Sequence, residues 1–120
     1  MEQYKLGEME QRFADLIWSN EPVGSRALCE LCAAEFSWKR TTTYTMLKRL
    51  CDRRIFENQN GTVVALMAKN EFGAMQGERF LNDAFGGSLP RFLAAFTRQN
   101  HLSDDEINEL QRLIDEHKEG

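Results

Sequence analysis

Cationic and hydroxyl side chains are concentrated between Ser37 and Phe56, in the stretch SWKRTTTYTMLKRLCDRRIF. Six Lys or Arg residues and a single acid, Asp52, give this stretch a local net charge of +5. Cations bind phosphate oxygens, and threonine and tyrosine side chains can contact base edges and thymine methyls. The residue types therefore predict a DNA-binding face. The residues expected on it are Lys39, Arg40, Thr41, Thr42, Tyr44, Thr45, Lys48, Arg49, Arg53 and Arg54.

The spacing of apolar residues in the same stretch predicts a helix. Thr43, Met46, Leu47 and Leu50 recur at intervals of three and four residues, so they share one face that can pack inward. Lys39 and Arg40 stand at the start of this helix, where its dipole disfavours cations unless an anion docks there. The alternative is a solvated helix with good helix formers on its outer face.

The elements around this helix predict a winged helix in residues 1–69. An amphipathic helix over Leu6–Trp18 ends before Pro22, and Ser25 is a suitable N-cap for a second helix to about Phe36. Two helices joined tightly, with a basic second member, are typical of a helix-turn-helix. Asn60-Gly61 then predicts a β-hairpin, which in this order would be the wing.

Residues 70–120 have a different composition and predict a helical dimerisation domain. Five of the eight Phe residues lie here, in helices that would end at Gly86-Gly87, follow Ser88 and start at Ser103. Three short helices cannot easily bury so much aromatic surface alone, and pairing with a second copy would cover it. The alternative is packing on the first half. The residues expected in the dimer contact are Phe80, Phe85, Phe92, Phe96, Leu110, Leu113 and Ile114.

Charge is divided unevenly along the 120 residues. The whole chain has a net charge of -4, but residues 1–69 carry +1 and residues 70–120 carry -5. Phosphate contacts respond to the local patch, so the first half is expected to face DNA. No apolar run reaches the roughly 18–20 residues needed to span a bilayer, and we expect a cytoplasmic protein.

Neither catalysis nor a cofactor is expected. Cys29, Cys32 and Cys51 form an odd set without a second Cys pair for zinc, and we expect buried small hydrophobes. Neither histidine lies near a set of nucleophilic residues, and no Gly-rich phosphate loop occurs.

Taken together, the motifs resemble the penicillinase repressor family, the winged-helix regulators of β-lactamase and methicillin-resistance genes. The residues that carry the resemblance are Leu16-Ile17-Trp18, Trp38, Thr42, Thr45, Leu47-x-Arg49-Leu50, Gly86-Gly87 and Leu102-Ser103-Asp104-Asp105-Glu106-Ile107. The resemblance implies a homodimeric repressor that binds a double-stranded, palindromic DNA operator through its first domain. It also implies relief by proteolysis, with Ala95-Phe96 at the corresponding place and a membrane sensor or protease acting indirectly.

The sequence departs from the family pattern at two places. Arg54 stands where members usually have a Gly before the first wing strand, so the local turn is expected to differ. Tyr44 stands where better-known members carry a cation or amide, which leaves the operator sequence open.

Two other kinds of function remain as alternatives. One is a winged-helix protein-interaction module without DNA binding, against which the +5 stretch argues. The other is a thiol-based redox switch using Cys29 and Cys32, which would need exposed thiols of depressed pKa.

Overall fold

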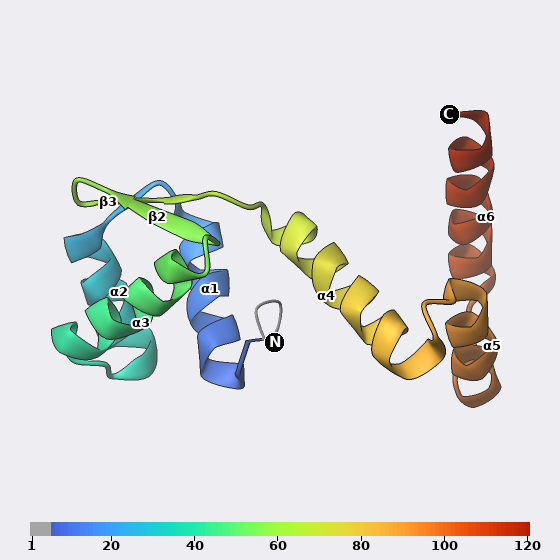
Figure 1. Cartoon of the computed structure of the whole chain (residues 1–120), viewed down its shortest axis with the longest axis horizontal. Coiled ribbons are helices and arrows are strands. Elements are labelled where there is room, and N and C mark those ends of the chain that lie inside the picture. Colours follow the sequence, from blue (N-terminus) through green and yellow to red (C-terminus); the bar gives the residue numbers. More distant parts are fainter. Residues whose placement is uncertain (1–5) are drawn as a thin grey trace. The chain divides into compact units, whose positions relative to one another are not determined.

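The computed structural model describes residues 6–120, which divide after Arg79 into two compact units (Figure 1). The fold is a winged helix followed by helices, as the sequence predicts. None of the helices in residues 6–120 has the length and apolar content that a membrane span requires.

The first unit contains three helices around one core. They are α1 (Glu8–Asn20), α2 (Ser25–Phe36) and α3 (Arg40–Asp52). Each helix turns an apolar stripe inward, so the chain buries its large side chains without long loops. The fully or almost fully buried core residues include Phe13, Ile17, Leu28, Cys32, Leu47, Leu50, Ile55, Phe56, Val63 and Phe72.

A small antiparallel sheet with the order β1-β3-β2 completes this unit. The predicted hairpin is confirmed: β2 (Phe56–Gln59) pairs with β3 (Thr62–Ala65). Its two turn residues, Asn60 and Gly61, have φ values of 54° and 93°, and positive φ at both positions matches a type I′ turn. Strand β1 (Val23–Gly24), which pairs with β3, is not predicted from the sequence, because two residues carry no periodic signal.

Helix α4 (Lys69–Phe85) begins inside the first unit. Phe72 is 1% exposed and its ring centroid lies 5.8 Å from that of Trp18. The Trp18 indole N–H donates to the Met67 carbonyl over 2.9 Å, and Lys69 pairs with Asp15 at 3.3 Å. The first turns of α4 therefore belong to the winged-helix core, beyond the expected domain boundary at residue 69.

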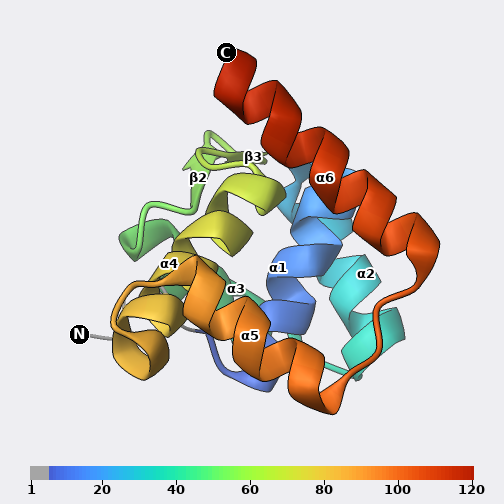
Figure 2. The ribbon, with the colours of Figure 1, turned by 90° about the vertical axis from the view of Figure 1, so that its right-hand side faces the viewer.

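The second unit holds the end of α4 with α5 (Leu89–Gln99) and α6 (Asp104–Glu119). The predicted capping box is confirmed, since the Glu106 N–H donates to the Ser103 hydroxyl and the Ser103 N–H donates to the Glu106 carboxylate, each over 3.1 Å. Figure 2 shows α5 and α6 diverging from the loop that joins them. Neither helix contains a buried residue, so their apolar faces stay at least partly exposed.

We predict that Phe72→Ala destabilises the first unit by about 3–5 kcal/mol, because it opens a cavity beside Trp18. Urea unfolding followed by tryptophan fluorescence measures this, since both tryptophans, Trp18 and Trp38, lie in the first unit. Gly73→Ala is the matched control: no atom lies within 4 Å of an added Cβ, and alanine should stabilise α4 by up to about 1 kcal/mol. A Phe72→Ala loss below 1 kcal/mol would show that α4 is not part of this core.

Candidate nucleic-acid interface

Helix α3 separates its residues into a buried and an exposed face, as predicted. Thr43, Leu47 and Leu50 are at most 3% exposed and pack into the core of the first unit. The opposite face is exposed and carries most of the predicted DNA-binding residues, namely Thr41, Thr42, Tyr44, Thr45, Lys48 and Arg49. Burial of one stripe thus fixes which side chains meet a partner in solution.

The cations around α3 differ in their surroundings. Lys39 and Arg40 are exposed at its start, where no side chain caps the helix. Lys48 pairs with Asp52 over 3.2 Å, but both side chains are more than 60% exposed. An exposed pair of this kind contributes little stability, so Lys48 can turn to another anion at small cost. Arg53 is half-buried at the C-terminal end of the helix, and Arg54 is exposed.

Tyr44 connects the exposed face of α3 to the wing through the start of α2. Its hydroxyl donates to the Ser25 hydroxyl over 3.3 Å, and the Ser25 N–H donates to the Gly61 carbonyl over 2.8 Å. The sequence analysis placed the N-cap of α2 at Ser25, whereas the N-cap is Gly24 and Ser25 is the first helical residue. The Ser25 N–H donates to the wing turn, a contact that the sequence of α2 alone could not predict.

The wing itself presents polar, uncharged side chains at its tip. Asn58, Gln59, Asn60 and Thr62 are exposed, and the Asn58 carboxamide oxygen accepts from the Gly61 N–H over 2.8 Å. No cation occurs between residues 56 and 65. Sequence reasoning named no wing residue as a contact, although amides and hydroxyls can bond phosphate oxygens.

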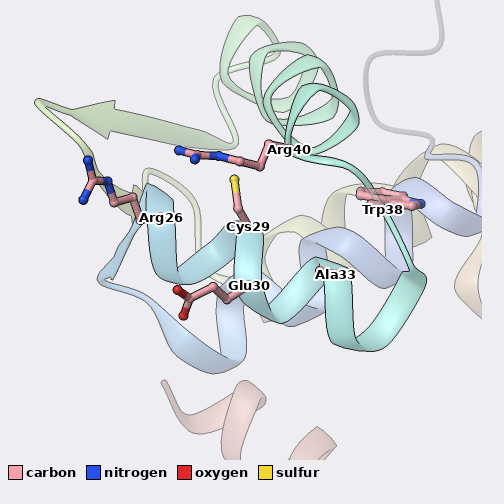
Figure 3. Close-up of a pocket in the computed structure, with 6 residues that line it drawn as sticks. All are labelled: Arg26, Cys29, Glu30, Ala33, Trp38 and Arg40. Atoms are coloured by element: carbon pink, nitrogen blue, oxygen red, sulfur yellow. The ribbon is translucent and has the colours of Figure 1, made fainter.

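A pocket of about 490 Å³ is lined by residues of α2 and of the start of α3 (Figure 3). Arg26 and Arg40 bring guanidinium groups to it, and the Cys29 thiol lies beneath the Arg40 side chain. The Tyr44 hydroxyl is the main cause of a raised pKa at Arg40, whose guanidinium is in any case charged at physiological pH. Arg26 is not among the residues predicted from the sequence, because one cation in α2 gives no periodic signal. The pocket is lined by Arg26, Cys29, Glu30, Ala33, Trp38 and Arg40.

Cys32 and Cys51 of the first unit behave as packing residues. Cys32 is fully buried, and burial raises the pKa of its thiol, an effect that the neighbouring Thr43 side chain partly offsets. Burial also raises the pKa of the half-buried Cys51 thiol. A raised pKa disfavours the reactive thiolate, so Cys32, one of the two residues of the redox alternative, lends that alternative no support. Within residues 6–120, no three His, Cys, Asp or Glu side chains gather as a metal site would require.

The predicted dimer residues form an aromatic cluster and an apolar stripe in the second unit. The ring centroid of Phe92 lies 5.5–5.9 Å from those of Phe80, Phe85 and Phe96. Phe80, Leu113 and Ile114 are about half exposed, at 51%, 50% and 51%. Phe96 is 38% exposed, while Phe85, Phe92 and Leu110 are half-buried. These side chains leave an apolar surface uncovered within the single chain.

Comparison with known proteins agrees with this geometry. The profile of the family described as penicillinase repressor matches residues 6–116. The penicillinase repressor of Bacillus licheniformis is 24% identical over 118 residues, which cover 95% of this chain and 92% of that protein. The methicillin resistance regulatory protein MecI of Staphylococcus aureus is 20% identical over 115 residues, covering 92% and 94%. MecI of Mammaliicoccus sciuri is 19% identical with the same coverage.

Arg54 occupies a strained position between α3 and the wing. Its φ is 64°, in the left-handed region that costs a residue with a Cβ roughly 1–2 kcal/mol. The Arg54 N–H donates to the Cys51 carbonyl over 2.9 Å, and the Ile55 N–H to the Leu50 carbonyl over 3.2 Å. The turn thus keeps a conformation that suits glycine, and the Arg side chain is tolerated there because it points into solvent.

We predict that Arg54→Gly raises the free energy of unfolding of the first unit by up to about 1 kcal/mol, because glycine relieves the positive φ. The same change removes one exposed cation and should weaken DNA binding. Thermal unfolding by tryptophan fluorescence, beside a gel-shift titration, separates the two effects. Arg54→Asn, which also tolerates a left-handed φ, should reproduce both directions. A drop in stability for both variants would show that the side chain of Arg54 is a structural contact.

Proposed function

Since the profile of the penicillinase repressor family spans almost the whole chain, the chain belongs to that family of DNA-binding transcriptional repressors, and we propose that it is a homodimeric repressor of a palindromic operator. The observation that carries the proposal is the exposed face of α3. That face combines hydroxyls, a phenol and cations on a helix whose opposite stripe is buried.

In this proposal α3 enters the major groove. Its exposed threonines, Thr41, Thr42 and Thr45, lie on the N-terminal half of the helix, the part that contacts base edges in helix-turn-helix proteins. Threonine can donate to or accept from a base and can pack its methyl on thymine. Lys48, Arg49 and Arg54 then lie toward the other end, where they would contact phosphates.

Dimerisation is proposed to occur through the second unit. Apolar side chains that are half exposed in α4 and α6 would be covered by a second copy, and a two-fold pair is the usual solution. When two recognition helices are linked, the second half-site is bound at a high effective concentration, which raises the overall affinity by a factor of about 10²–10⁴. A palindromic operator follows from the two-fold symmetry of such a dimer.

Relief by proteolysis between Ala95 and Phe96 is the finer part of the proposal. This bond lies within α5, and the Phe96 carbonyl accepts from the Asn100 N–H over 2.9 Å. A protease binds an extended segment, so α5 would have to open locally before cleavage. The absence of buried residues in α5 lowers the cost of that opening. Cleavage would separate α6 from the rest of the unit and lower the dimer population.

We predict that Thr45→Ala weakens operator binding by about 1–3 kcal/mol and leaves binding to random DNA almost unchanged, because a base contact carries sequence information and a phosphate contact does not. Fragments selected from random DNA by the purified protein supply the operator, and gel-shift titration measures both constants. Thr97→Ala, at an exposed helical threonine of the second unit, is the matched control and should change neither. Equal losses on both DNAs would assign Thr45 to a non-specific contact.

We predict that Ile114→Glu raises the dimer dissociation constant at least about 30-fold, since burying an unpaired carboxylate costs about 2 kcal/mol or more. Sedimentation equilibrium measures the constant. Asn108→Glu adds the same charge to the opposite face of α6 and should leave dimerisation intact. A dimer that is insensitive to Ile114→Glu would place the contact elsewhere.

A further inference from the structure

The pocket between α2 and the start of α3 combines two cations with an open, mostly uncharged lining. Arg26 projects from the first turn of α2, and Arg40 is the first residue of α3. In Figure 3 the Arg40 side chain runs over the Cys29 sulfur toward the end of α2 that carries Arg26. Two guanidinium groups from different helices are thus directed to one hollow of about 490 Å³.

The two guanidinium groups have no anionic partner in the described chain. Among residues 6–120, neither Arg26 nor Arg40 forms an ion pair with a carboxylate, although Glu30 lines the same pocket. Arg40 interacts instead with the Tyr44 hydroxyl and the Cys29 thiol, neither of which is a carboxylate. Like charges directed to one place repel each other unless an anion lies between them, so the arrangement favours an anionic ligand.

The first turn of α2 adds to this preference. No side chain caps it, and its N-cap is Gly24. The Ser25 N–H is taken by the Gly61 carbonyl of the wing, but the following amides of the turn point out of the helix start. The positive end of the helix dipole then favours a negative group beside Arg26.

The position of the pocket identifies the source of the anion. Arg40 lies both in the pocket and on the exposed face of α3 that is proposed to enter the groove, and Tyr44 on that face bonds Ser25 of α2. In helix-turn-helix proteins the helix before the recognition helix meets the DNA backbone. We propose that this pocket binds one phosphodiester group of the operator backbone between Arg26 and Arg40, and that Arg26 is the phosphate contact contributed by α2.

This inference rests on the proposed function and adds a contact outside the residues that the recognition helix supplies. One phosphate per subunit gives two per dimer, placed symmetrically about the operator centre. Since each phosphate contact contributes about -0.9 to the slope of log K against log salt, the two pockets account for about -1.8 of the slope. A phosphate held by α2 also fixes how deeply α3 enters the groove.

The test compares Arg26→Gln with the unmodified chain in gel-shift titrations from low to physiological salt. Glutamine keeps the helix propensity close to that of arginine, and Arg26 is exposed, so the variant should fold and show an unchanged melting temperature. We expect the slope to become shallower by about 1.8 on operator and on random DNA alike. Glu30→Gln removes the one carboxylate of the pocket and should tighten binding roughly two- to fivefold.

Several outcomes would overturn the assignment. If Arg26→Gln shows the same salt slope as the unmodified chain, Arg26 does not contact a phosphate and the assignment is wrong. The proposed function would still stand in that case, provided that the unmodified chain binds DNA with a salt-dependent affinity. Failure of the unmodified chain to bind DNA would instead reject the proposed function. Titration with inorganic phosphate, followed by ³¹P NMR, tests the other source of the anion. Phosphate binding that Arg26→Gln abolishes, with an unchanged DNA slope, would assign the pocket to a free phosphate compound and overturn the proposal.

Discussion

The burial of one stripe of α3 is the constraint on which the rest of the first unit depends. Thr43, Leu47 and Leu50 can leave water only if the helix lies with that stripe against the common core. Rotation of α3 about its axis would expose two large aliphatic side chains, at a cost of roughly 1.5–3 kcal/mol each. The orientation of the hydroxyl and cationic side chains on the other face is therefore set by packing, before any DNA is present.

The same core also connects α3 to its neighbours. The Trp18 ring contacts both Phe56 of the wing and Phe72 of α4, with ring centroids 5.1 and 5.8 Å away. A bond from Tyr44 to Ser25 and one from Ser25 to Gly61 join the three segments that would meet DNA. A change in the wing turn or in the first turn of α2 can thus reach the exposed face of α3 through two hydrogen bonds.

The two units differ in how far they bury their own apolar side chains. The first unit covers its own aromatic side chains, and Phe13, Phe56 and Phe72 are at most 1% exposed. The helices α5 and α6 of the second unit contain no buried residue. Hydrophobic surface of that kind is covered by association more cheaply than by folding when helices are short. If the proposed dimer forms, a chain with one self-sufficient unit and one unit that needs a partner can have its DNA affinity controlled through assembly.

The sequence by itself determined the helices, the hairpin and the buried face of α3. Apolar spacing located α1, α2 and α3, Asn60-Gly61 located the wing, and the Ser103–Glu106 capping box located the start of α6, because these signals are local. Tertiary structure decided the features that depend on contacts between residues distant in sequence. It paired β1 with β3, placed Phe72 in the first core, and brought Arg26 to Arg40 from a different helix. A cation in α2 and one in α3 carry no shared pattern along the chain, and only the packing of the two helices brings them to one pocket.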